Sequence, residues 1–134
     1  MNSQKIHIEN FEKERKEILN AYRGLIRSIK NRSKQETKII RKAFDIALEA
    51  HKDMRRKSGE PYIYHPIAVA KICAEEIDLD VKSVICAILH DTVEDTYLTL
   101  KDIEELFGTE VSKIIDGLTK IPDVFDENAS IQAE

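Results

Sequence analysis

Apolar residues recur along most of the chain at the spacing of one helix face. In the first segment they lie three, four or seven residues apart, and most positions between them are polar or charged. This pattern predicts a first helix from about Ile8 to Ile29, with its apolar stripe facing a core: Phe11, Ile18, Tyr22, Leu25 and Ile29. Ser33 and Glu36 form the capping-box pattern that begins a second helix. His51 lies on the apolar face of that helix, so we interpret it as a buried core histidine rather than a ligand.

Three shorter helices and a final apolar stripe follow from the rest of the pattern. Pro66 suits the first turn of a helix that ends near Asp78, and it favours an extended backbone at His65. Asp80 can cap a central helix that runs from Val81 to about Asp91. Thr99 starts another helix, which stops at Gly108. The inward residues that we predict for it and for the last stripe are Leu100, Ile103, Leu106 and Phe107, then Val111, Ile114, Ile115 and Leu118.

Composition agrees with a helical globular domain. The chain has 134 residues, of which 42% are hydrophobic and 34% charged, and it has only 4 Gly and 3 Pro. Strand signals are scarce, so we expect an all-α fold. The longest wholly apolar run is six residues, which is too short to span a bilayer, and no signal-peptide core begins the chain. Cys73 and Cys86 lie among apolar neighbours, and we interpret them as reduced core residues of a cytoplasmic protein.

Charge is distributed unevenly along the chain. The net charge of −4 combines a balance of +7 over residues 1–42 with −11 over residues 43–134. A basic arm of this kind can bind RNA or an acidic partner. Because the basic residues alternate with Glu and apolar positions, we favour solvated helix faces and expect no direct nucleic-acid binding and no membrane association.

Candidate metal chemistry begins where the central apolar run, residues 84–89, meets His90 and Asp91. Glu94 and Asp95 add two further carboxylates, and acids crowded beside a core helix need a compensating cation. A divalent metal with His90 as co-ligand meets that need, although a solvated acidic loop explains these residues equally well. With His65 added, the His and Asp ligands suit Mn, Fe, Zn or Co. Such a metal activates water for phosphoester hydrolysis, and Glu94 and Asp95 could manage the proton of that water.

A basic loop over residues 52–61 precedes His65 and ends in turn-forming residues. Arg56, Lys57 and Ser58 could clasp a phosphate, because Arg binds phosphate bidentately or stacks on a base, Lys adds a charge and Ser donates a hydrogen bond. Taken alone, these residues fit an ordinary basic surface loop better.

Several ordered motifs together resemble the hydrolase domain of the RelA/SpoT homologue family, an HD-type domain that degrades the alarmone (p)ppGpp. The motifs are residues 56–66, 90–96, 107–111 and 116–120, within a resemblance that covers about residues 40–121. It implies an HD-type helical fold and Mn(II) bound by His65, His90 and Asp91. Glu94 and Asp95 would be catalytic, orienting and activating the attacking water.

The resemblance also implies a substrate and a reaction. Arg56 would stack on guanine, with Lys57 and Ser58 near the nucleotide, and hydrolysis would release the 3′-pyrophosphate of (p)ppGpp to leave GDP or GTP. One departure is Asp53-Met54, where the family commonly has Gly-Gln, and it puts in question the shape of the loop that enters the nucleotide pocket. Two alternatives stay open: another HD-type nucleotide phosphohydrolase, and a non-catalytic nucleotide-binding or regulatory fragment.

The family comparison further predicts an incomplete domain. We expect residues 1–134 to form a single HD-type domain truncated at its C-terminus, with residues 1–33 as a leading helix and with a synthetase domain in the longer protein. Family members take a further Asp ligand from an Ala-Asp-Arg-Leu-His-Asn-like segment that does not occur here, and Asp116, Asp123 and Asp126 fit that role poorly. We therefore expect the fourth ligand beyond Glu134, little hydrolysis by residues 1–134 alone, and self-association through uncovered apolar surface.

Overall fold

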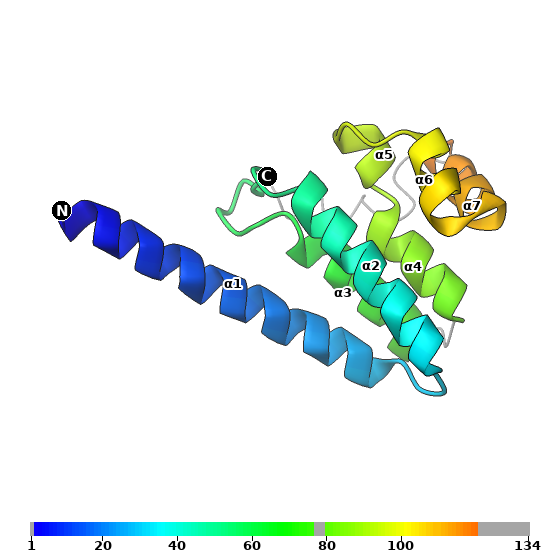
Figure 1. The fold of residues 1–134 in the computed structure, drawn as a ribbon, viewed down its shortest axis with the longest axis horizontal. Coiled ribbons are helices and arrows are strands. Elements are labelled where there is room, and N and C mark those ends of the chain that lie inside the picture. The colour runs from blue at the N-terminus through cyan, green and yellow to red at the C-terminus, as the bar shows by residue number, and fades with distance from the viewer. Residues whose placement is uncertain (1, 77–79, 121–134) are drawn as a thin grey trace.

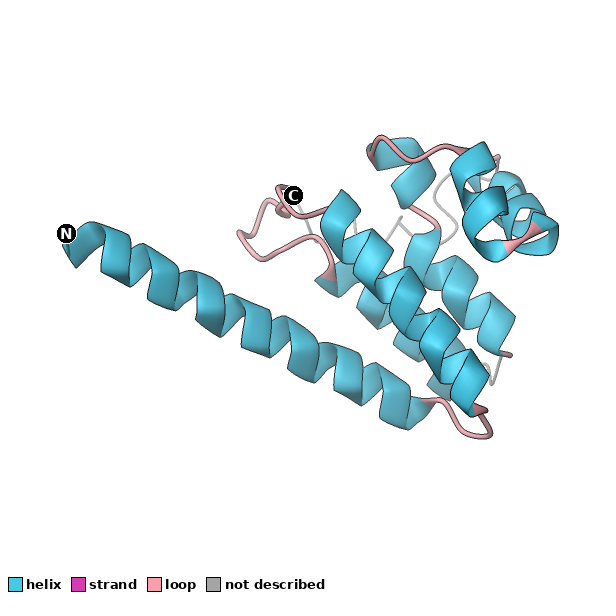
Figure 2. Ribbon diagram, in the orientation of Figure 1, coloured by secondary structure: helices cyan, strands magenta, loops and turns pink. Residues whose placement is uncertain are grey.

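The fold is all-α in the part of the chain that the computed structural model describes, residues 2–76 and 80–120, with side chains from residue 9 onward. Figures 1 and 2 show helices joined by short loops, and these residues contain no strand. The helices are α1 (Asn2–Ser28), α2 (Lys34–Ala50), α3 (Tyr64–Glu75), α4 (Val81–Leu89), α5 (Thr92–Asp95), α6 (Leu100–Phe107) and α7 (Thr109–Thr119). The predicted fold class is confirmed.

Helix α4 lies at the centre of this arrangement. It packs against α3 and α2, and α7 joins the α6–α7 hairpin to it, while α1 packs along α3. The six residues 84–89 are all buried, as the unbroken apolar run predicts. Because α4 is buried on every side, the residues that follow it emerge inside the protein rather than on its surface.

Three helix starts follow the predicted capping residues, Ser33, Asp80 and Thr99. Each side chain accepts a hydrogen bond from the backbone N–H of the third helical residue, at 3.0, 2.9 and 3.1 Å respectively. In α2 and α6 that third residue, Glu36 or Asp102, also accepts from the backbone N–H of the cap, which completes a capping box. Such caps satisfy N–H groups that have no partner within the helix.

Several predicted inward residues are exposed instead. Phe11 is 63% exposed because the N-terminal half of α1 extends beyond the other helices (Figure 1). Leu106 and Ile114 are each 37% exposed, whereas Ile103 and Ile115 on the same two helices are fully buried. Ile103 of α6 and Ile115 of α7 belong to the core, so only part of each stripe is covered. Whether this exposed apolar surface supports self-association stays a prediction.

The predicted backbone at His65 is wrong. Helix α3 already begins at Tyr64, so His65 lies in its first turn rather than in an extended segment. Pro66 is the third residue of α3, where a backbone N–H would have no partner within the helix, and the missing donor therefore costs little. The predicted end of this helix, Asp78, lies outside the described residues.

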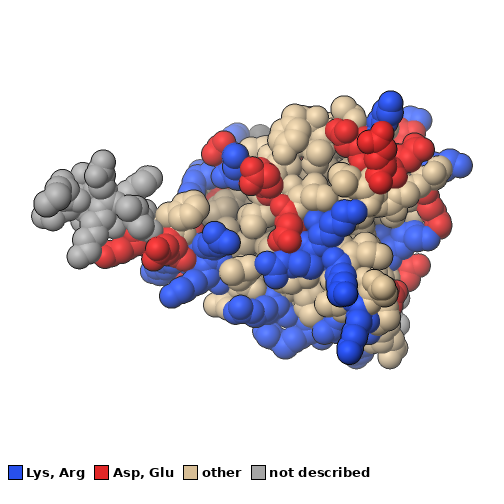
Figure 3. All heavy atoms as spheres, viewed as in Figure 1, with Lys and Arg blue, Asp and Glu red and all other residues tan. Residues whose placement is uncertain are grey.

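Charged side chains separate on the face drawn in Figure 3. Lys and Arg gather over the α1 and α2 side, and Asp and Glu gather around α6. This separation reproduces the charge asymmetry of the sequence in space. Among the described residues, no helix is both long enough and apolar enough to cross a membrane.

Candidate metal centre

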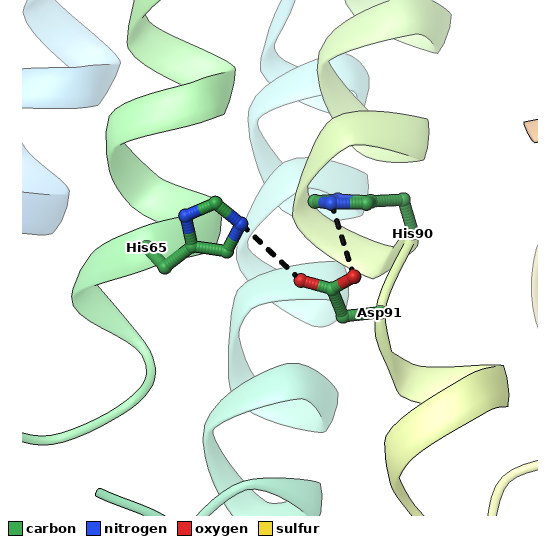
Figure 4. A group of neighbouring side chains, drawn as sticks. All are labelled: His65, His90 and Asp91. Atoms are coloured by element: carbon green, nitrogen blue, oxygen red, sulfur yellow. Dashed lines mark ion pairs between the residues drawn. The ribbon is translucent and has the colours of Figure 1, made fainter. Parts of the chain in front are cut away.

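Two histidines and one aspartate come together inside the protein. His65 comes from the first turn of α3, and His90 and Asp91 come from the junction of α4 and α5. One ligand atom from each lies within 4.8 Å of the others, and the residues are 9%, 6% and 1% exposed. Figure 4 shows the Asp91 carboxylate between the two rings: its Oδ2 is 3.4 Å from His65 Nε2, and its Oδ1 is 3.2 Å from His90 Nε2.

The end of α4 creates this arrangement. The helix stops at Leu89, and His90 keeps a helical backbone while Asp91 begins the next turn, with its carbonyl accepting from the Asp95 N–H at 2.9 Å. The chain therefore changes direction at the His-Asp pair. Packing of α3 against α4 then brings His65 to the same point.

The hydrogen bonds of the cluster suit a metal ion. His90 Nδ1 lies 2.6 Å from the carbonyl oxygen of Ala87, and because a carbonyl only accepts, Nδ1 carries the proton. In the neutral ring Nε2 then presents a lone pair toward a carboxylate oxygen, and two such acceptors need a proton or a cation between them. A backbone carbonyl that fixes the tautomer of a metal-binding histidine is a recurring feature of metal sites. The residues therefore fit a metal with nitrogen and oxygen ligands.

Tyr62 joins this cluster, and the sequence interpretation gave it no role. Its hydroxyl donates to Asp91 Oδ2 at 2.8 Å and lies 3.4 Å from Asp95 Oδ2. Its ring stacks on His51 with centroids 4.8 Å apart and meets the His65 ring edge-on at 5.8 Å. The available signal was its position three residues before His65, on the turn that leads into α3.

His51 is a buried core residue, in agreement with its place on an apolar stripe. Its Nδ1 donates to the carbonyl oxygen of Ala47 at 2.9 Å, which leaves Nε2 buried without a hydrogen-bond partner within the protein. Burial lowers the pKa of His51, because a charged ring is poorly solvated there. The His51 ring is therefore fixed in the core, and the Tyr62 ring stacks on it.

The structure places the three predicted nucleotide-binding residues differently. The Arg56 side chain is 12% exposed, and its guanidinium lies over the Tyr62 ring, 5.6 Å from the centroid. Lys57 is exposed on the same loop. The Ser58 hydroxyl donates to Glu60 at 2.6 Å, within a tight turn. Arg56 thus lies beside the metal cluster, in contact with Tyr62.

The two predicted catalytic acids lie on α5, directly after the cluster. Both Glu94 and Asp95 are exposed, and Asp95 approaches Tyr62 as described above. Their exposure suits contact with water and substrate, whereas Asp91 is enclosed.

Asp53 and Met54, where the sequence departs from the family's Gly-Gln, lie at the base of the loop. Met54 donates its N–H to the His51 carbonyl at 2.9 Å and accepts from the Tyr62 N–H at 3.0 Å. Arg55 and Pro61 form an isolated antiparallel bridge beside it. The loop is therefore closed by backbone pairing at its base, and this pairing holds Tyr62 in place.

A cavity of about 570 Å³ lies elsewhere, between α1, the C-terminal half of α2 and the start of the loop. Its lining includes Ile18, Phe44 and Leu48, and His51 and Met54 line it on the side toward Tyr62. The cavity contains none of the three clustered ligands, so we do not place the substrate there.

Comparison with known proteins settles the family. The model of the HD domain family matches residues 43–134, which include every candidate site residue. This chain belongs to the HD domain family. HD domains are metal-dependent hydrolases, and the cluster of two histidines and one aspartate in this HD domain is consistent with that chemistry.

Its relatives belong to the RelA/SpoT group, which confirms the family resemblance. The HD domain is 43% identical over 100 residues to the bifunctional (p)ppGpp synthase/hydrolase SpoT of Escherichia coli. The aligned region covers 74% of this chain and 14% of SpoT. It is 45% identical over 96 residues to a GTP pyrophosphokinase of Myxococcus xanthus, covering 72% of this chain and 12% of that protein. The chain thus spans 12% to 14% of the length of these curated relatives.

A solved structure shares the fold. It is described as a metazoan orthologue of SpoT that hydrolyses ppGpp, and it matches with a TM-score of 0.58 and 28% identity over 70% of this chain and 56% of that one. The predicted HD-type helical arrangement is therefore confirmed.

Proposed function

We propose that this HD domain hydrolyses the 3′-pyrophosphate of (p)ppGpp, giving GDP or GTP and pyrophosphate, with Mn(II) held by His65, His90 and Asp91. The observation that carries the proposal is the buried cluster of these three residues. It lies within a region that resembles both SpoT and a solved ppGpp hydrolase. The fourth protein ligand stays a prediction, because the residues after Lys120 lie outside the described part of the chain.

The three ligands supply the chemistry of the donor set. The Nδ1–H of His90 donates to the Ala87 carbonyl, so His90 offers Nε2 to the metal. His65 also offers Nε2, and both nitrogens face the Asp91 carboxylate. Asp91 contributes negative charge, which favours a divalent cation. Bound Mn(II) would supply Lewis acidity toward water and the phosphoester.

Glu94 and Asp95 would receive the proton that the attacking water loses. They lie one turn beyond the ligands on α5, and both carboxylates are exposed to solvent. A general base must come within hydrogen-bond reach of the water, and the position of both residues on α5, directly after Asp91, supports this assignment.

Arg56 would bind the guanine base. One side of its guanidinium is covered by the Tyr62 ring, so the base would stack on the opposite side. Its partly buried side chain has few alternative positions, which reduces the entropy lost on binding. Lys57 and Ser58 would contact the phosphates from the same turn of the loop.

The test is an assay of ppGpp with Mn(II), using the natural gene product that contains residues 1–134. We expect release of GDP and pyrophosphate, loss of turnover on chelation, and recovery when Mn(II) is returned. His90→Ala and Asp91→Asn should abolish turnover and Mn(II) binding, whereas Asp45→Asn removes an exposed carboxylate that pairs with Arg41 on α2 and should change neither.

Three results would contradict the proposal. One is full turnover in a folded Asp91→Asn variant. Another is equal hydrolysis of unrelated phosphoesters, which would favour a different HD-type phosphohydrolase. The third is saturable ppGpp binding without product, which would favour a non-catalytic nucleotide-binding module.

A further inference from the structure

Tyr62 contacts all three parts of the proposed site. Its hydroxyl donates to the metal-ligand candidate Asp91 at 2.8 Å and lies 3.4 Å from the proposed base Asp95. The guanidinium of Arg56 lies over its ring, at 5.6 Å from the centroid.

We infer that Tyr62 is a positioning residue: its hydroxyl holds Asp91 for the metal, and its ring holds Arg56 for the guanine. The inference rests on the proposed function, because it assigns roles to Asp91 and Arg56. It concerns Tyr62 itself, to which the sequence motifs gave no role.

The hydroxyl acts on Asp91 through one carboxylate oxygen. Oδ2 accepts from Tyr62, while Oδ1 faces His90 Nε2 at 3.2 Å. A carboxylate that is tied at one oxygen cannot rotate freely about its side-chain bonds, so both oxygens stay oriented toward the two histidines. Partners of this kind orient metal ligands and commonly change metal affinity when they are removed.

The ring is itself firmly held. The backbone N–H of Tyr62 donates to Met54 at 3.0 Å, and the ring stacks on His51, which is 2% exposed and bonded to Ala47. A positioning residue works only if its own conformation is fixed by packing and hydrogen bonds. Tyr62 meets that condition on both its backbone and its ring.

The two contacts of Tyr62 use different atoms, so they can be separated by substitution. Tyr62→Phe keeps the ring over Arg56 and His51 but removes the donor to Asp91. Tyr62→Leu removes both the donor and the aromatic ring. Tyr64→Phe is the matched control: Tyr64 is two residues away and half-buried. Burial, together with Glu17 and Glu14 of α1, raises the pKa of the Tyr64 hydroxyl.

The experiment measures two affinities on the natural gene product that contains residues 1–134. Mn(II) affinity is followed by the electron paramagnetic resonance signal of free Mn(II), and ppGpp affinity is measured with chelator present. Tyr62→Phe should weaken Mn(II) binding by about tenfold to a hundredfold while leaving metal-free ppGpp affinity within about twofold of the parent. Tyr62→Leu should weaken both, and Tyr64→Phe neither.

Thermal unfolding of each variant completes the test. A purely structural role predicts a lower melting temperature for Tyr62→Phe with parental Mn(II) affinity, and that result overturns the inference. Parental ppGpp affinity in a folded Tyr62→Leu variant overturns the ring's role. Absence of saturable Mn(II) binding by the parent overturns the inference together with the metal site. If the parent binds Mn(II) but releases no pyrophosphate, the proposed function fails, while the affinity comparison still decides the role of Tyr62.

Discussion

Replacing Arg56 by alanine should weaken the use of ppGpp by roughly 1–3 kcal/mol, because a single side chain supplies both a planar surface and a positive charge. In the structure the Arg56 side chain is 12% exposed, with the Tyr62 ring on one side of its guanidinium and the Glu60 carboxylate 4.0 Å from Nε. A partly desolvated cation–π contact contributes about 0.5–2 kcal/mol and a charge-assisted hydrogen bond about 1.5–3 kcal/mol, so the expected loss corresponds to about one such contact rather than to their sum. The same loss expressed as kcat/KM is roughly fivefold to 150-fold.

Arg56→Lys separates the charge from the plane. It retains the cation but cannot stack, so we expect little recovery of kcat/KM. Arg55→Ala is the matched control, because it removes the same charge one residue earlier. Arg55 forms a 2.7 Å ion pair with Glu14 of α1, so steady-state kinetics should remain near the parental values.

Either of two results would refute this reasoning. Parental kinetics in Arg56→Lys would mean that charge alone is needed and that guanine does not stack on this side chain. An equal loss in Arg55→Ala and Arg56→Ala would mean that the loop acts through its total charge. Circular dichroism of each variant establishes that the helices are intact before the kinetics are compared.

Further predictions concern stability. Thr99→Ala removes the cap of α6 and should lower the free energy of unfolding by about 1 kcal/mol in urea titrations, whereas Thr109→Ala, at an uncapped position, should have a much smaller effect. Gly108 has φ of 100°, so Gly108→Ala should cost about 1–3 kcal/mol; an unchanged urea midpoint would contradict the strain. Burial lowers the pKa of His51 in the folded protein, so at mildly acidic pH the unfolded chain binds a proton on this ring that the folded protein does not. Stability should therefore fall as the pH drops below about 6.5, and His51→Gln should flatten that part of the urea-derived profile.

Local sequence determined where three of the helices begin. Ser33, Asp80 and Thr99 cap the helices that they were predicted to cap, because a cap depends on residues three positions apart on one short segment. The buried run 84–89 was equally clear, since a helix that is apolar on every side has no stable position outside a core. The motifs around His65 and His90 further identified the family, which the comparisons confirm.

Tertiary structure decided which side chains meet. Phe11 and Leu106 fit their apolar stripes but stay exposed, because burial depends on where a neighbouring helix ends. His65 was expected on an extended segment, yet it lies in the first turn of α3, where a proline at the third position is tolerated.

The role inferred for Tyr62 depended on the fold alone. Its hydroxyl bonds to Asp91, 29 residues further along the chain, and its ring contacts His51 and Arg56 from the preceding helix and loop. Periodicity and capping report on neighbours within a few positions, so they could not place Tyr62 against Asp91. That contact exists because α3 packs on α4 and brings the start of one helix beside the end of the other.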